Sequence, residues 1–182
     1  MPNLPKLSKL LSRLLRHDAD AVGLVLDEHG YTELSEVWKL VENRYPAAYK
    51  LADLQQVVAG DATGKQRFEL VGDRIRALYG HSAVRLITYE SVEPPELLYH
   101  GTSAKALAAI RANGLLRRAR QYVHLTTRLD RATQVGSRHG GQTIILTVRA
   151  AFAHRAGVQF YHPESDHYLA EDIPAAYINF PD

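Results

Sequence analysis

Arginine is the most prominent chemical feature in the C-terminal half of this 182-residue chain. Residues 97–182 carry ten basic and six acidic side chains, a net charge of +4, and Lys105 is the only lysine among them. The planar guanidinium group binds phosphate oxygens through paired hydrogen bonds, so this pattern favours a phosphate or nucleic-acid ligand. A solvated helix face is the alternative explanation. Between residues 111 and 138 only Asp130 opposes seven arginines, namely Arg111, Arg117, Arg118, Arg120, Arg128, Arg131 and Arg138.

Four short motifs place arginine or histidine where a side chain could meet a ligand. Taken singly, each has a structural explanation: Arg16 could cap a helix, Arg67 could form a cross-strand ion pair, and His100 could be a core histidine. Their combination is more specific than any one of them. The motifs are Leu15-Arg16-His17; Lys65-Gln66-Arg67-Phe68; Tyr99-His100-Gly101-Thr102-Ser103, followed by Gly114-Leu115 and Tyr122-Val123-His124-Leu125; and Val135-Gly136-Ser137-Arg138-His139-Gly140.

Two familiar nucleotide-binding motifs are excluded by spacing. Gly60, Gly64 and Lys65 resemble a phosphate-binding loop, but the spacing is one residue short. In addition, Gln66 stands where a magnesium-binding hydroxyl is required. No Gly-x-Gly-x-x-Gly follows a strand, so the sequence does not support a doubly wound dinucleotide fold.

Composition argues against a metal centre and a membrane protein. The chain has no cysteine, which removes sulfur ligands, thiolate nucleophiles and disulfides. His154, His162 and His167 lack a carboxylate partner at helical spacing, so loop or surface histidines are the expected interpretation. The sequence has no apolar run of about 18 residues and no signal core, which favours a cytoplasmic protein without a membrane partner.

Three helices and a hairpin must position Arg16 and Arg67 in the N-terminal part of the chain. Leucines at helical spacing predict a helix over residues 7–15, with Arg16 and His17 at its C-terminal end. Alternating apolar residues on either side of Gly72-Asp73 predict the hairpin. This order favours a winged-helix-like lobe. The other two helices are Leu34–Val41, with Thr32 as N-cap, and Leu51–Val58, ending at Gly60.

Short strands and short helices alternate in the C-terminal part and predict an α+β lobe of mainly antiparallel strands. The stiff polar segment Glu93-Pro94-Pro95-Glu96 predicts a linker, which gives domains at residues 1–93 and 97–182. The predicted strands are Leu97–Tyr99, Tyr122–Leu125, Thr143–Val148 and Tyr168–Leu169, and the predicted helices are Ala104–Ala112, between Ser103 as N-cap and Gly114 as C′ residue, and Leu129–Ser137.

In this order and spacing the motifs resemble the RNA 2′-phosphotransferase family (tRNA 2′-phosphotransferase, KptA type). The resemblance runs from Leu7 to Phe180 and rests on LLRH, KQRFEL, RIRALYGHS, LYHGTS, VHLT and VGSRHG. It implies a winged-helix RNA-binding lobe followed by an NAD-binding lobe with the ADP-ribosyltransferase fold. It also implies NAD-dependent removal of an internal 2′-phosphate, the mark that certain RNA ligases leave at a splice junction. The implied partners are tRNA-like RNA and NAD, with no metal and a monomeric enzyme.

The resemblance assigns catalysis to Arg16, His17, Arg67 and Arg138. A phosphate monoester is largely dianionic near neutral pH, because its second pKa is about 6, so it can attack the nicotinamide ribose without a catalytic base. The three arginines would hold this anion, and His17 would donate a hydrogen bond or a proton to the leaving oxygen in a second step. The implied products are 2′-hydroxyl RNA, nicotinamide and ADP-ribose 1″,2″-cyclic phosphate, formed through a 2′-phospho-ADP-ribosylated RNA.

The resemblance also assigns NAD binding to the C-terminal lobe. His100 matches the strand-end histidine that holds NAD, and Gly101 would let the backbone approach the carboxamide without a Cβ in the way. His124 matches the second family histidine. His167 stands where the family usually has an apolar residue, and its role is open. The remaining predicted NAD contacts are Thr102, beside His100, and Ser103, Gly114, Leu115 and Leu116 at the adenosine.

Two other functions stay open from the sequence. One is ADP-ribosylation of a nucleic-acid terminal phosphate, in which only the first chemical step occurs. The other is a non-enzymatic winged-helix RNA binder with a degenerate second lobe. The four intact catalytic matches argue against degeneration. A small departure from the family pattern is Tyr79, where glutamine is frequent.

Overall fold

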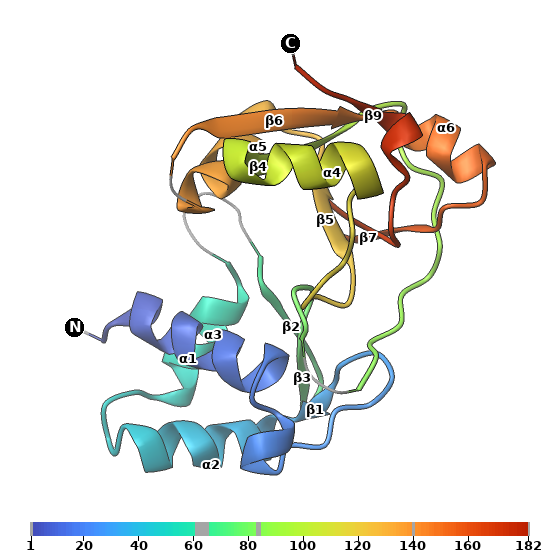
Figure 1. Cartoon of the computed structure of the whole chain (residues 1–182). Coiled ribbons are helices and arrows are strands. Elements are labelled where there is room, and N and C mark those ends of the chain that lie inside the picture. The colour runs from blue at the N-terminus through green and yellow to red at the C-terminus, as the bar shows by residue number, and fades with distance from the viewer. Residues whose placement is uncertain (1, 61–65, 83–84, 140, 182) are drawn as a thin grey trace. The chain divides into compact units, whose positions relative to one another are not determined.

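Residue contacts divide the chain into two units, Met1–Thr88 and Tyr89–Asp182. The computed structural model in Figure 1 describes residues 2–60, 66–82, 85–139 and 141–181. Gly64, Lys65 and Gly140 of the sequence motifs lie outside the described residues. Each unit combines helices with an antiparallel sheet, so the predicted α+β class is confirmed.

The described residues of the first unit form three α-helices and a three-stranded sheet of order β1-β3-β2. Leucines at the predicted spacing bury one face of α1, and the Asn3 side chain caps this helix by accepting a hydrogen bond from the Lys6 N–H at 3.0 Å. The predicted hairpin forms, because Gly72 takes a positive φ of 58° in the two-residue turn between Val71 and Arg74. The elements are α1 (Leu4–Arg16), the 3-10 helix η1 (Asp20–Val22), β1 (Thr32–Glu33), α2 (Leu34–Arg44), α3 (Leu51–Val58), β2 (Phe68–Val71) and β3 (Arg74–Ala77).

Thr32 does not cap the second helix, which corrects the prediction from sequence. It lies in β1 opposite Ile75 of β3 and is buried. The first turn of α2 has no side-chain cap, and the Leu34 N–H donates to the Asp73 carbonyl at 2.8 Å. A strand pairing between distant residues, which local spacing does not reveal, therefore replaces the local cap.

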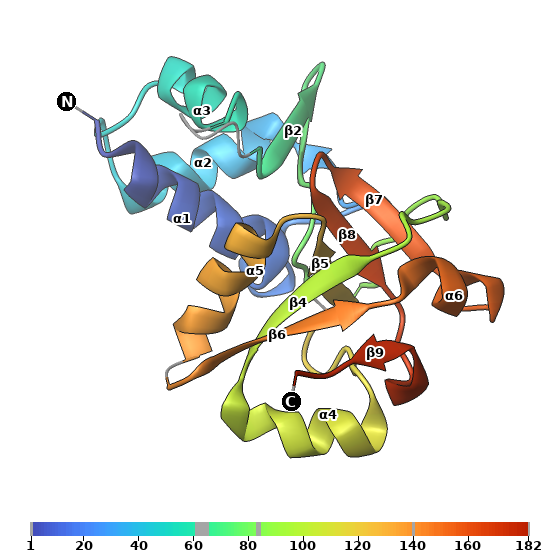
Figure 2. The same cartoon turned by 90° about the horizontal axis from the view of Figure 1, so that it is seen from above.

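The second unit is a six-stranded sheet of order β7-β8-β5-β4-β6-β9, in which every neighbouring pair is antiparallel. Figure 2 shows α4 and α5 on opposite faces of this sheet. The core contains Ile110 of α4 together with the fully buried Leu98, Leu146 and Phe160. The elements are β4 (Leu98–Ser103), η2 (Ala104–Ala106), α4 (Leu107–Asn113), β5 (Val123–Thr126), α5 (Leu129–Gly136), η3 (Ser137–His139), β6 (Thr143–Val148), α6 (Ala150–Arg155), β7 (Phe160–Glu164), β8 (His167–Ala170), η4 (Ala175–Tyr177) and β9 (Ile178–Asn179).

Several short elements of the second unit differ from the prediction. Strand β4 continues through Ser103, so this residue precedes the 3-10 helix η2 rather than α4, and its side chain makes no capping hydrogen bond. Helix α4 ends before Gly114, whose φ of 78° agrees with the predicted helix end. Helix α6 and strands β7 and β9 lie outside the elements predicted from the sequence.

The boundary between the units lies at Thr88 rather than at the predicted residue 93. The segment after Thr88 joins the second unit, because the Val92 N–H donates to the Phe160 carbonyl at 2.8 Å and Ser91 forms a bridge with Tyr161. The ring centres of Tyr89 and Tyr161 are also 6.1 Å apart. The Pro-Pro segment thus follows the boundary instead of forming it.

Candidate functional site

Arg16 ends α1, and its side chain is held from two sides within the first unit. Its Nη2 donates a long hydrogen bond of 3.4 Å to the backbone oxygen of Arg67. The guanidinium carbon lies 5.0 Å from the ring centre of Tyr79 and 5.8 Å from that of Phe68. The cation–π contacts and the long hydrogen bond restrain the guanidinium group, whose type binds phosphate oxygens well.

His17 follows Arg16 at the C-cap of α1 and is exposed. Its backbone N–H donates to the Arg13 carbonyl at 3.1 Å, and its ring Nδ1 lies 2.7 Å from the Ser82 hydroxyl oxygen. The Ser82 N–H in turn donates to the Arg16 carbonyl at 2.9 Å. Ser82 therefore binds the end of α1 through its backbone and orients the His17 ring through its side chain.

Arg67 directly precedes β2 and is partly buried. Its carbonyl accepts hydrogen bonds from Arg16 and, at 3.0 Å, from the Leu78 N–H. The hairpin base and the end of α1 are thereby joined. The structure brings Arg16, His17 and Arg67 together within the first unit, and we call these three residues the first-unit group.

Arg138 belongs to the second unit, and two glycines allow the helix before it to pack directly on the sheet. A Cβ on Gly101 of β4 would lie 1.8 Å from the Ala132 carbonyl oxygen of α5, and a Cβ on Gly136 would lie 2.5 Å from Cγ2 of Thr143. Helix α5 can approach β4 only because both positions are glycine. The helix continues into η3, where Arg138 is exposed.

This packing corrects the physical reason given for Gly101. In the interpretation from sequence, the carboxamide of NAD approaches the backbone where a Cβ would otherwise lie. In the structure, the carbonyl of Ala132 occupies that space. The contact between α5 and β4 by itself requires glycine here. A contact between the Gly101 backbone and a ligand stays a prediction.

His100 lies in β4 and reaches the neighbouring strand β5. Its Nδ1 is 2.9 Å from the backbone oxygen of His124. A carbonyl oxygen only accepts hydrogen bonds, so Nδ1 of His100 carries a proton in this contact. The hydrogen bond therefore sets both the tautomer and the ring orientation.

His124 contacts a second histidine across the next pair of strands. Its Nδ1 lies 3.0 Å from Nε2 of His167 in β8, and the two ring centres are 5.1 Å apart with planes at 56°. Strands β4, β5 and β8 are neighbours in the sheet.

The other predicted NAD contacts differ in exposure. Thr102 is buried in β4, and Leu115 lies in the core, 4% exposed, with its N–H donating to the Ile173 carbonyl at 2.9 Å. A Cβ on Gly114 would lie 2.1 Å from the same carbonyl oxygen, so packing requires this glycine too. Leu116 is 44% exposed. Of the two neighbouring leucines, Leu116 is therefore the one whose side chain a ligand can reach.

Two contacts beside these residues are not predicted from the sequence. Ser82 contacts His17 and is the last residue of RIRALYGHS, one of the motifs that carry the family resemblance. That motif could have indicated a role for Ser82. Arg131 of α5 pairs with Asp166, the residue before His167. No local spacing signals that ion pair, because 35 residues separate its partners in the sequence.

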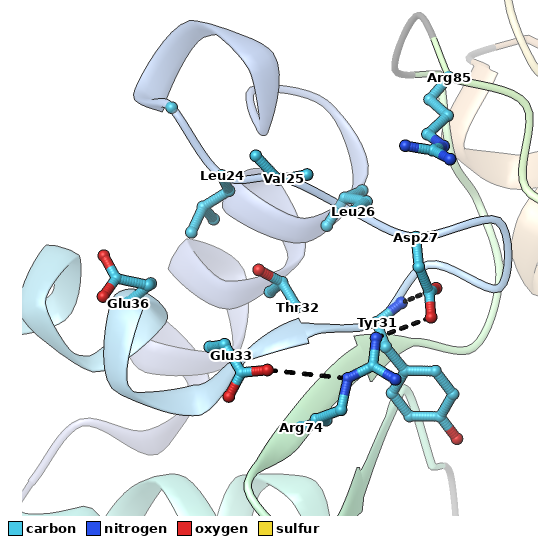
Figure 3. A pocket seen from close by; sticks show the side chains of 11 residues that line it. Leu24, Val25, Leu26, Asp27, Tyr31, Thr32, Glu33, Glu36, Arg74 and Arg85 are labelled. Carbon is cyan, nitrogen blue, oxygen red and sulfur yellow. Dashed lines mark hydrogen bonds and ion pairs between the residues drawn. The ribbon is translucent and has the colours of Figure 1, made fainter.

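A pocket of about 370 Å³ lies elsewhere in the first unit and includes none of the predicted site residues (Figure 3). On one side of it, Asp27 accepts hydrogen bonds from the N–H groups of His29 and Tyr31 at 2.9 and 2.8 Å and from Arg74 at 2.7 Å. Burial raises the pKa of Asp27, but the hydrogen bonds outweigh burial and lower the pKa from its ordinary value. Asp27 and Arg74 thus stabilise the loop before β1.

Two kinds of site are absent from the described part of the chain. Residues 2–60, 66–82, 85–139 and 141–181 contain no group of three or more His, Asp or Glu side chains placed to hold a metal ion. In those residues no helix is both long and apolar enough to cross a membrane.

The comparisons with known proteins point to one family. A model of the RNA 2′-phosphotransferase, Tpt1/KptA family matches residues 3–172, which span both units. A probable RNA 2′-phosphotransferase of Lacticaseibacillus paracasei is 39% identical over 179 residues, 97% of this chain and 93% of the relative. Relatives with the same description from Streptomyces griseus and Pectobacterium atrosepticum are each 39% identical, over 95% and 94% of this chain and 94% and 95% of their own.

Proposed function

The chain belongs to the RNA 2′-phosphotransferase family, Tpt1/KptA, and from this membership we propose that it removes an internal 2′-phosphate from RNA with NAD as co-substrate. The observation that carries the proposal is the fixed guanidinium of Arg16, held by the Arg67 carbonyl and the Tyr79 ring beside His17. An oriented guanidinium group with a histidine ring beside it suits a dianionic phosphate.

Each unit has one part in this proposal. The first unit is a winged-helix-like RNA-binding lobe, supported by its three α-helices and the hairpin β2–β3. The second unit is an ADP-ribosyltransferase-like NAD-binding lobe, supported by its antiparallel sheet with helices on both faces. The proposed RNA is tRNA-like and carries its phosphate at a splice junction.

In the first step, an oxygen of the RNA 2′-phosphate attacks the anomeric carbon of the nicotinamide ribose. A phosphate–carbon ester bond forms, the glycosidic bond breaks, and its electron pair leaves with neutral nicotinamide. The attacking group is already an anion, so the protein needs to supply no base. Arg16 and Arg67 bind the phosphate oxygens and hold the nucleophile in place.

In the second step, the neighbouring 2″-hydroxyl of the ribose attacks phosphorus and releases its proton to solvent. The bond between phosphorus and the RNA 2′-oxygen breaks, which releases 2′-hydroxyl RNA and ADP-ribose 1″,2″-cyclic phosphate. Charge grows on the phosphoryl oxygens in this step, so it makes the greater demand on the arginines. His17, oriented through Nδ1 by Ser82, donates a proton or hydrogen bond to the leaving oxygen.

The residues of the second unit fit a role in holding NAD. The hydrogen bond from Nδ1 to the His124 carbonyl holds the His100 ring in one orientation, which suits a residue that contacts a ribose. Thr102, Ser103, Leu116 and His124 complete the proposed contacts, together with the backbone at Gly101 and Gly114, whereas Leu115 pairs its backbone with Ile173 and supports this edge by packing. Arg138 is the fourth proposed catalytic residue, and its alanine variant tests its part in the reaction.

Incubation with an oligonucleotide that carries one internal 2′-phosphate tests the proposal. We expect loss of the phosphate with NAD and none without it, and we expect the rate to be unchanged by a metal chelator. Equal activity without NAD, or activity abolished by chelator and restored by zinc, would refute the proposal. A stable ADP-ribosylated RNA as the final product would instead favour a terminal-phosphate ADP-ribosyltransferase.

A further inference from the structure

His124 and His167 are diagonal neighbours on one face of the sheet. In the pairing of β5 with β8, His124 lies opposite Leu169 and Thr126 lies opposite His167. Residues two positions apart on a strand point to the same face, so the two histidines share a face and lie one step apart along it. Diagonal positions are within reach of aromatic side chains.

The two rings meet through their nitrogens rather than only by packing. Nδ1 of His124 and Nε2 of His167 are 3.0 Å apart, a normal hydrogen-bond distance. One nitrogen must carry the proton and the other must offer its lone pair, so at least one ring is neutral in this contact. The hydrogen bond therefore fixes the orientation of each ring and couples their tautomers.

The turn that carries His167 is itself tied to α5. Arg131 pairs closely with Asp166, and its Nη2 lies 3.6 Å from Glu164. The three side chains are only 14%, 14% and 7% exposed, so solvent screens their attraction weakly. The Thr127 N–H also donates to the Asp166 carbonyl at 3.1 Å. Both the start of α5 and the end of β5 thus hold this turn in place.

The charged side chains near this turn pair with one another, namely Arg128, Asp130, Arg131, Glu164 and Asp166. Arg128 lies 3.9 Å from Asp166 and forms a closer pair with Asp130. His167 begins β8 directly after Asp166, and its Nε2 points to His124. The ion pairs hold the backbone beside His167 in place. The hydrogen bond between the two rings then restricts the orientation of the His124 ring.

We propose that His167 is a positioning residue for NAD binding, whose Nε2 holds the His124 ring in the orientation that the second unit uses to bind NAD. The proposal rests on the proposed function, because it takes NAD as the ligand of this unit. A hydrogen bond between neutral groups contributes about 0.5–1.5 kcal/mol. Its loss should therefore weaken NAD binding by about threefold to tenfold.

Three variants separate positioning from a general effect of mutation. His167→Val removes the hydrogen bond, whereas His167→Gln places an amide group near the position of Nε2 and should restore part of it. His162→Gln is the matched control, because His162 lies in the same hairpin, is exposed and bonds to the Ser165 carbonyl through Nε2 at 2.9 Å. Thermal unfolding of each variant checks that the fold is kept.

The first measurement is the Kd for NAD by calorimetry, together with KM and kcat for NAD in RNA dephosphorylation. H167V should raise Kd and KM by about threefold to tenfold with a smaller change in kcat, H167Q should fall between H167V and the wild type, and H162Q should match the wild type. Unchanged Kd in a folded H167V, or an equal effect of H162Q, would overturn the proposal.

The second measurement reads the hydrogen bond directly, without NAD. In the full-length protein labelled with ¹⁵N at histidine, the wild type and H162Q should show a coupling between two imidazole nitrogens that H167V lacks. Absence of this coupling in the wild type contradicts the proposal. A wild type that binds no NAD overturns the proposed function and this proposal together, whereas normal NAD binding that H167V leaves unchanged overturns this proposal alone.

Discussion

Replacing Arg16 with alanine should slow removal of the RNA 2′-phosphate by at least about tenfold, since a charge-assisted hydrogen bond contributes about 1.5–3 kcal/mol. The structure adds a separate cost in stability. The variant also loses the hydrogen bond to the Arg67 carbonyl and the stacking on Tyr79, each worth about 0.5–1.5 kcal/mol. Unfolding should therefore become easier by about 1–3 kcal/mol.

Lysine at position 16 tests the geometry of the group rather than its charge. The ammonium keeps the positive charge but lacks the planar fork, so Arg16→Lys should recover only part of the rate. Arg13→Ala is the matched control, because Arg13 lies one turn earlier on α1, is 73% exposed and pairs with Asp18. A surface ion pair of this kind contributes little, so the control should stay within about twofold of the wild-type rate.

The assay is steady-state dephosphorylation of the 2′-phosphorylated oligonucleotide at saturating NAD, with thermal unfolding measured on the same samples. We expect Arg16→Ala to stay folded at the assay temperature and still to have a lower kcat. The loss of kcat then cannot come from unfolded protein. Wild-type kcat in Arg16→Ala, or an equal loss in Arg13→Ala, would refute the assignment of Arg16 to the phosphate.

Three further substitutions test the elements that support the site. Gly101→Ala puts a Cβ 1.8 Å from the Ala132 carbonyl oxygen, so thermal unfolding should show the second unit destabilised by at least about 2 kcal/mol. An unchanged melting temperature would contradict the close packing of α5 on β4. Arg131→Met leaves the buried carboxylates of Glu164 and Asp166 without their partner and should lower stability by about 3 kcal/mol in denaturant titration. An unchanged stability would show that these ion pairs do not stabilise the turn. The pKa of Asp27 is lowered in the fold, so its carboxylate stabilises the fold above its ordinary pKa of 3.8 and loses this effect as the pH falls through the lowered value. Asp27→Asn should therefore reduce stability at pH 7 by about 1–2 kcal/mol and flatten its decline below pH 4, and an unchanged stability profile against pH would refute this role.

Local signals in the sequence predict the parts of the fold that depend on neighbouring residues. The leucine spacing of α1 sets its buried face and places Arg16 at its end, and the Gly72-Asp73 turn sets the hairpin before Tyr79. Gly114 has the positive φ expected at a helix end. These features follow from helical period, turn chemistry and capping, which act over a few residues.

Features that depend on distant residues do not follow from the same signals. Thr32 has the chemistry of an N-cap, but its pairing with Ile75 places it in a strand. Gly101 has the flexibility that a ligand contact would use, but the backbone of α5 lies against it. The contact between His124 and His167 depends on the register of β5 with β8, which a single sequence does not specify.

The fate of the phosphorus atom tests the central claim most directly. RNA labelled with ³²P at its internal 2′-phosphate is incubated with the protein and NAD, and the products are separated at early times. The two-step reaction predicts label in ADP-ribose 1″,2″-cyclic phosphate, with nicotinamide released in equal amount. Label recovered as inorganic phosphate while NAD is not consumed would contradict it.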